Sequence, residues 1–172
     1  MIALLQAALL FLCPALLIVA ALKDVTSYTI PNWISLALIV GFFPAALALG
    51  LPWSSLGLHV GIGVTALVVG MAMFALGWIG GGDAKVFAAT ALWLGWPASG
   101  TFLLATALAG GALAVLLLAM RSMLLRPYVS AGPSWLSRLA EPGENVPYGL
   151  AICIGGLAAF PPSALMVRLA GA

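Results

Sequence analysis

Long apolar runs separated by short polar breaks dominate the chain. Each run is continuous rather than alternating, which favours membrane-crossing helices over the strands of a transmembrane β-barrel. The pattern therefore predicts an all-α, polytopic membrane fold with about six crossings. The apolar runs lie at about 2–22, 32–50, 56–79, 84–96, 99–120 and 147–168.

The breaks between the runs carry helix start and stop signals. Pro31 precedes the second run, and Leu-Pro-Trp-Ser-Ser at 51–55 precedes the third. The fourth run is short and is followed by Gly-Trp-Pro-Ala-Ser-Gly at 95–100. This combination indicates a tilted or partly re-entrant element at 84–96.

Composition supports a bilayer as the natural solvent. The chain is 65% hydrophobic and 6% charged, whereas soluble domains carry roughly 25% charged residues. The net charge of +2 is too small to favour nucleic acid as a partner. Cys13 and Cys153 lie inside apolar runs without metal-ligand spacing, so we interpret them as small core residues. No metal and no cofactor is expected.

The lysines and arginines favour one orientation. Lys23 follows the first run, so the positive-inside rule places it in the cytoplasm and the N-terminus outside. Threading six helices from there leaves only Arg168 of the six cationic residues outside. The cytoplasmic set is Lys23, Lys85, Arg121, Arg126 and Arg138. We therefore expect one domain spanning residues 1–172, with a polar cytoplasmic loop at about 121–146.

The chain has four acidic residues, and two of them stand out. Glu141 and Glu144 fall in the polar loop, where solvated charge explains them. Asp24 and Asp83 each lie where an apolar run reaches the cytoplasmic surface. Two crossings separate them, so they can meet although they are 59 positions apart. Ionisable groups at membrane depth are unfavourable and commonly mark function.

Each of these aspartates also has a structural explanation. Asp83 could cap a helix that begins at Ala84, and Asp24 could anchor the first helix at the interface together with Lys23. Three glycines precede Asp83, whereas one is enough to permit an unusual turn. The three consecutive glycines predict a stretch of backbone without side chains that an extended peptide can approach. The candidate substrate-binding residues are Gly80, Gly81 and Gly82.

The residue types narrow the chemistry. The only histidine, His59, begins the third run on the opposite membrane face, so it cannot serve as a base for either aspartate. Metal hydrolysis would need more nitrogen or sulfur ligands. A pair of carboxylates remains, and neighbouring carboxylates share a proton. The ionised one can draw a proton from water while the protonated one supports the carbonyl oxygen.

Several motifs resemble those of the type IV prepilin peptidase family. "GGGD" at 80–83 fits the GxGD motif of membrane aspartic proteases, and "DVTSYTIPN" at 24–32 resembles the family's Asp-to-Ile-Pro-Asn signature. Lys85 and "VPYGLAI" at 146–152 extend the resemblance over nearly the whole chain. It implies an aspartic endopeptidase with Asp24 and Asp83 as its catalytic pair. The implied reaction removes the short basic leader of a pilin precursor at the cytoplasmic face of the bacterial inner membrane.

One departure from the larger members is informative. Those members carry a cytoplasmic segment with paired CxxC motifs and also N-methylate the product. This chain has no CxxC, so it resembles the minimal form that serves Flp-type (tight-adherence) pili, and methylation is not implied.

Two alternative functions stay open. One is a non-catalytic membrane subunit of a pilus or secretion assembly; the other is a proton-coupled transporter, which would place its acids near the bilayer midplane.

Overall fold

The computed structural model describes residues 1–130, 132–139, 141 and 146–171, and within these ranges the chain is helical without strands. Glu144 lies outside the described residues, and Glu141 is exposed. The helices are α1 (Ile2–Ser27), α2 (Asn32–Ala48), α3 (Trp53–Ala75), α4 (Gly81–Leu94), α5 (Ala98–Met120), α6 (Arg126–Ser130), α7 (Ser134–Leu139), α8 (Tyr148–Ala159) and α9 (Ala164–Ala170).

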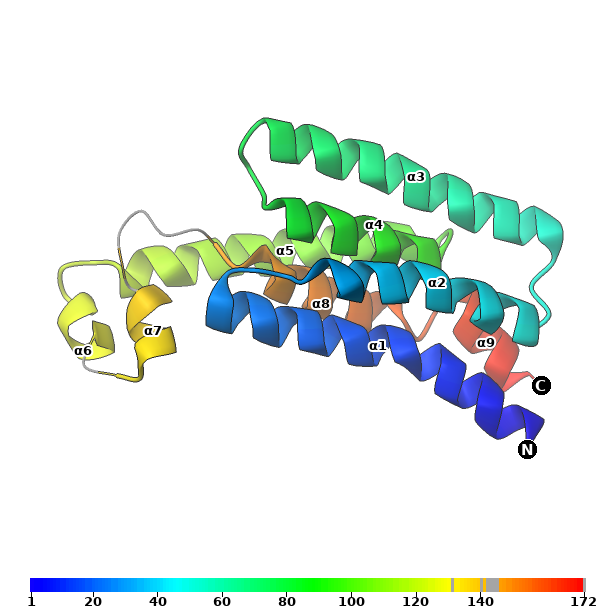
Figure 1. Ribbon diagram of the computed structural model, residues 1–172. Coiled ribbons are helices and arrows are strands. Elements are labelled where there is room, and N and C mark those ends of the chain that lie inside the picture. Colours follow the sequence, from blue (N-terminus) through cyan, green and yellow to red (C-terminus); the bar gives the residue numbers. More distant parts are fainter. Residues whose placement is uncertain (131, 140, 142–145, 172) are drawn as a thin grey trace.

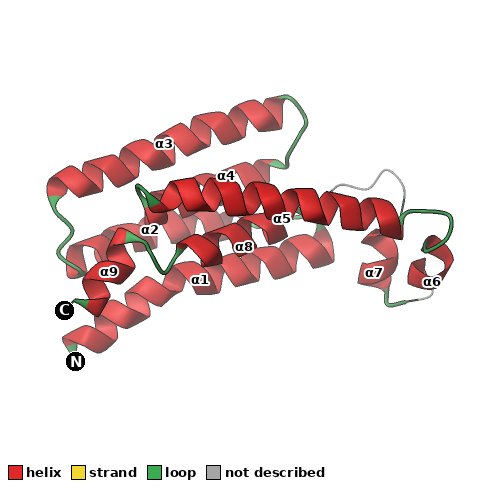
Figure 2. Cartoon of the chain, turned by 180° about the vertical axis from the view of Figure 1, so that it is seen from behind, coloured by secondary structure: helices red, strands yellow, loops and turns green. Residues whose placement is uncertain are grey.

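The helices form an elongated bundle with two distinct ends (Figure 1). α1, α3 and α5 finish at the end where α2, α4 and α8 begin, and α6 and α7 lie beyond it. Both termini lie at the opposite end, as the reverse view also shows (Figure 2). Arg168 lies at the terminal end, where its guanidinium donates a hydrogen bond of 2.9 Å to the carbonyl of Gly50. The other five cationic residues lie toward the α6–α7 end, which agrees with the predicted sorting.

The expected count of six crossings is not confirmed. By length and apolar composition α1, α3 and α5 can cross a membrane, and α8 with α9, bent by 42° at a short break, would add a fourth span. α2 has 17 residues and α4 has 14. At 1.5 Å per residue they reach about 26 and 21 Å, less than the roughly 30 Å of a hydrocarbon core.

Several helix ends follow directly from the sequence, and others do not. α2 begins immediately after Pro31 and α3 immediately after Pro52, because proline fixes a backbone angle that suits a helix start. α1 continues to Ser27, past the expected end at residue 22. α4 starts at Gly81 rather than Ala84. Both aspartates therefore lie inside helices instead of in the connecting segments.

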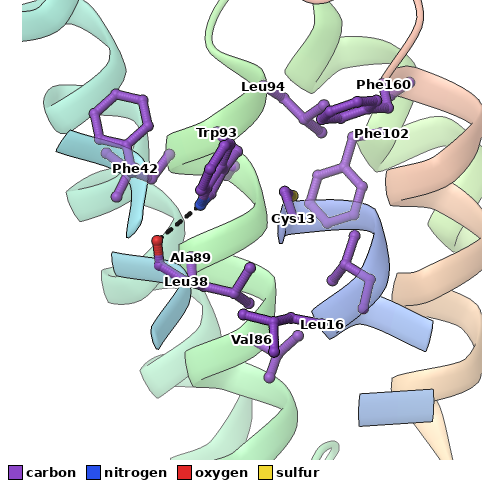
Figure 3. Close-up of a cluster of buried hydrophobic side chains, with 14 of the residues drawn as sticks. Cys13, Leu16, Leu38, Phe42, Val86, Ala89, Trp93, Leu94, Phe102 and Phe160 are labelled. Atoms are coloured by element: carbon purple, nitrogen blue, oxygen red, sulfur yellow. Dashed lines mark hydrogen bonds between the residues drawn. The ribbon is translucent and has the colours of Figure 1, made fainter. Parts of the chain in front are cut away.

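α4 is the central helix of the bundle. It packs against α2, α3 and α8, and most of its side chains are buried. Trp93 is fully buried, and its indole N–H donates a hydrogen bond of 2.8 Å to the carbonyl of Leu38 on α2 (Figure 3). Phe42 packs edge-on against the same indole, with ring centres 5.9 Å apart. These contacts fix the helix that carries Asp83.

The predicted polar loop at 121–146 contains two short helices, α6 and α7, and its residues 131, 140 and 142–145 lie outside the described part of the chain. The described part turns back toward the bundle. The Arg121 side chain donates to the Leu139 carbonyl at 3.0 Å, and the Arg138 guanidinium lies 5.6 Å from the centre of the Tyr28 ring. The segment therefore contacts the end of α1 that carries Asp24.

Candidate active site

Asp24 lies near the end of α1 and is buried, with 4% of its surface exposed. Its Oδ2 accepts a hydrogen bond of 2.7 Å from the backbone N–H of Gly149, which is 125 positions away. Gly149 is the second residue of α8, so its N–H has no partner within its own helix. A helix N-terminus favours negative charge, and α8 therefore supports an ionised carboxylate at Asp24.

Asp83 is the third residue of α4 and is also buried, with 6% of its surface exposed. Its Oδ2 accepts a hydrogen bond of 3.1 Å from the N–H of Gly80, the residue before the helix. This contact resembles half of a capping box, so Asp83 stabilises the helix start, although not as a cap before Ala84. Its Oδ1 is buried and accepts no hydrogen bond from the described residues. One carboxylate oxygen thus remains open for chemistry.

The fold brings the two aspartates together. Burial, and then the charge of Asp24, raise the pKa of Asp83 from 3.8 to about 7, while the N–H groups of Gly80 and Gly149 oppose the rise. The N–H of Gly149 therefore acts on both carboxyl groups. Acids that interact in this way titrate as a pair and hold one proton between them over a range of pH.

The three glycines before Asp83 have reasons within the chain to be small. A Cβ at Gly82 would lie 3.1 Å from the Cβ of Ile30 and 3.3 Å from its carbonyl oxygen. A Cβ at Gly80 would lie 2.9 Å from Oδ2 of Asp83, and one at Gly81 would lie 3.4 Å from the Phe74 ring. Substrate contact at these glycines stays a prediction, because internal packing also explains them.

Gly149 is the residue that the sequence interpretation did not single out. A Cβ there would lie 2.8 Å from Oδ2 of Asp24 and 2.9 Å from Cδ1 of Ile30. Only glycine can present its N–H to Asp24 at this distance. The sequence feature that could have indicated this role is the position of the glycine, directly after Pro147 and Tyr148 at the start of an apolar run.

The other polar candidates lie apart from the pair. Lys85 is exposed and donates a hydrogen bond of 2.8 Å to Oδ1 of Asn32, and Lys23 is exposed. His59 is buried, and its Nδ1 lies 2.7 Å from the carbonyl oxygen of Leu92. Leu92 follows Asp83 by nine residues on α4, which is about 13 Å along the axis. As expected, His59 cannot reach either aspartate.

The geometry offers two desolvated carboxyl groups from α1 and α4, an N–H from α8 that donates to Asp24, and one oxygen of Asp83 without a described hydrogen-bond partner. This arrangement suits general acid–base chemistry on a carbonyl group. The sequence model of the type IV leader peptidase family matches residues 11–115, which is more than half of the chain. The matched range includes Asp24 and Asp83. No curated protein and no solved structure matched the chain. The chain belongs to the type IV leader peptidase family.

Proposed function

We propose that this membrane protein is an aspartic endopeptidase in which Asp24 and Asp83 remove the leader of type IV pilin precursors. The family supports a leader peptidase function. The observation that carries the aspartic assignment is that the two acids are both buried and close enough for the charge of Asp24 to act on Asp83. Burying an ionisable side chain in a membrane protein is energetically unfavourable. Such residues therefore commonly mark a functional site.

The two acids have different surroundings, which suggests different roles. Asp24 accepts the N–H at the start of α8 and acts as the ionised base that takes a proton from the attacking water. Asp83, with its pKa raised to about 7, holds the shared proton up to about neutral pH. Its Oδ1 hydrogen-bonds to the scissile carbonyl oxygen, and its proton then passes to the leaving amine. No covalent intermediate is formed, because water is the nucleophile.

The side of cleavage and the class of precursor are part of the proposal. Asp24 near the end of α1 and Asp83 near the start of α4 lie toward the α6–α7 end of the bundle (Figure 1), as do five of the six cationic residues. The positive-inside rule places that end in the cytoplasm of a bacterial inner membrane, where the basic leader of a precursor lies. The resemblance to the minimal family members favours Flp-type precursors as substrates.

Co-expression with a Flp-type pilin precursor, in bacteria without their own leader peptidase, tests this function. We expect a leader-sized mobility shift on a gel, and a mature N-terminus when the product is sequenced. The same cells without this protein provide the control. Full-length precursor throughout, with this protein present in the membrane, would favour the non-catalytic subunit.

A further inference from the structure

Two apolar grooves flank α3, one on each side of the line where it packs against α4. This line is close, because a Cβ at Gly70 would lie 3.2 Å from the Cα of Ala84 on α4. The first groove, of about 480 Å³, lies between α3 and α5 and is also lined by α4 and α8. The second groove, of about 640 Å³, lies between α3 and α2 and is also lined by α4.

The α5 wall of the first groove consists mainly of small residues. Ala107, Gly110, Gly111 and Ala114 line it at the spacing of one helix face. In membranes such faces let another helix approach closely, because small side chains keep the backbones near each other. A Cβ at Gly111 would meet no described atom within 4 Å, whereas one at Gly110 would lie 3.7 Å from Tyr148 on α8. The small-residue face is therefore packed against α8 at Gly110 and open at Gly111.

The first groove lies next to the candidate site, and residues from three separate segments connect the two. Phe87, which lines it, lies one helical turn after Asp83 on the same face of α4. Ile79 lines it from the residue before Gly80, and Tyr148 lines it from the residue before Gly149. A helix in this groove would therefore end beside the two aspartates.

The second groove is larger but has a different chemistry near the site. Lys85 lines it together with Asn32, its hydrogen-bond partner. The α4 residues along this groove include Lys85 and Ala89, whose positions on the helix turn away from Asp83. A basic leader would meet a like charge here, whereas the first groove leads it to a pair of acids.

We propose that the first groove, lined by Met73, Phe87, Gly110, Gly111 and Tyr148, receives the apolar helix of the pilin precursor. The basic leader that precedes this helix then emerges at the α6–α7 end, so that the junction lies against Asp24 and Asp83. This inference rests on the proposed function and adds where the substrate binds. The occupant is a single apolar helix with positive charge at its leader end.

Two methionines on α3 provide a matched test. Met73 lines the first groove and Met71 lines the second. Met73→Cys and Met71→Cys, each combined with Asp83→Asn to trap the substrate, are mixed in membranes with Flp-type precursors that carry single cysteines along the helix. After oxidation by copper phenanthroline, we expect a disulfide-linked complex from Met73→Cys and at least tenfold less from Met71→Cys.

The reverse ratio, or no complex from either variant, overturns the groove assignment when the unmodified protein cleaves the same precursor. Failure of the unmodified protein to cleave any precursor refutes the proposed function instead, and this inference with it. The buried Cys13 and Cys153 are present in both variants, so they contribute the same background.

Filling the groove provides a second, kinetic test. Gly111→Leu places a side chain in the first groove without a described atom within 4 Å of its Cβ. We expect KM for the precursor to rise at least tenfold while kcat changes less than threefold. Gly61→Leu on α3 has equally open surroundings and lines neither groove, and it should cleave normally. An unchanged KM in Gly111→Leu contradicts the proposal.

Discussion

Replacing Gly149 by alanine should slow leader cleavage while the bundle stays folded. The new Cβ would lie 2.8 Å from Oδ2 of Asp24, 3.0 Å from its Cβ and 2.9 Å from Cδ1 of Ile30. Carbon atoms in good contact are about 3.5 to 4.0 Å apart, so these neighbours must retreat by roughly half an ångström or more. Because the Cβ of Asp24 is fixed to α1, rotation of the side chain alone cannot relieve the contact.

The magnitude follows from two effects. Overpacking of this kind lowers stability by about 1–3 kcal/mol, and a hydrogen bond to a charged group contributes about 1.5–3 kcal/mol. A misplacement of about 1 Å can slow catalysis about 100-fold. A shift of half that size, together with the lost N–H contact, predicts leader cleavage slowed at least about tenfold.

The assay compares purified wild type and Gly149→Ala in lipid, at saturating precursor, with the thermal midpoint measured on the same samples. The overpacking alone lowers the midpoint by about 2–12 °C. Gly61→Ala is the matched control, since a Cβ there meets no atom of the described residues within 4 Å, and it should retain the wild-type rate. A folded Gly149→Ala protein that cleaves at the wild-type rate would show that this contact does not position Asp24.

Three further outcomes are expected. Because the pKa of Asp83 is raised from 3.8 to about 7, the folded state binds the proton of Asp83 more tightly than the unfolded chain does. Proton binding at Asp83 therefore stabilises the fold at low pH, and this stabilisation declines as the pH rises from about 4 and is lost above about 7. Relative to Asp83→Asn, wild type should therefore lose up to about 4 kcal/mol of stability as the pH rises from about 4 to 7; a constant difference in thermal midpoint across this range would refute the reasoning. A reporter fused after Arg138 should be cytoplasmic and one at the C-terminus external, and the same side for both would refute the orientation. Trp93→Phe removes the donor to the Leu38 carbonyl and should lower the free energy of unfolding by about 1–3 kcal/mol; an unchanged thermal midpoint would contradict the central role of that contact.

The sequence predicted much of the fold because apolar runs and prolines act locally. The starts of α2 after Pro31 and α3 after Pro52 follow from this local chemistry. The end of α1 could not be read from polarity alone. Thr26 and Ser27 stay within the helix, and their hydroxyls donate hydrogen bonds of 2.7 Å to the carbonyls of Leu22 and Lys23. Polar residues that bond back to their own helix do not end it.

The last apolar run contained a signal that the prediction did not use. Pro161 and Pro162 lie in the break between α8 and α9. Two consecutive prolines remove two N–H donors from the helix, whereas the single prolines Pro14 and Pro44 lie inside α1 and α2. The expected single crossing at 147–168 is therefore two helices bent by 42°.

The meeting of Asp24 and Asp83 was predictable from helix direction, whereas the contact of Asp24 with Gly149 was not. That contact depends on how α1 and α8 pack, across 125 positions of sequence. Such packing between distant helices cannot be predicted from composition or residue spacing. The same limit applies to the groove beside α3, because it is formed by side chains from four helices.

The central claim is that both aspartates are needed for leader cleavage, and Asp24→Asn and Asp83→Asn test it most directly. Each variant keeps the size of the side chain but cannot ionise, and Glu141→Gln removes an exposed acid as the matched control. In membranes with a Flp-type precursor, we expect all three proteins to accumulate normally. Only Glu141→Gln should cleave, with each aspartate variant slowed at least about 1,000-fold. Processing at the wild-type rate by either aspartate variant would contradict the aspartic mechanism.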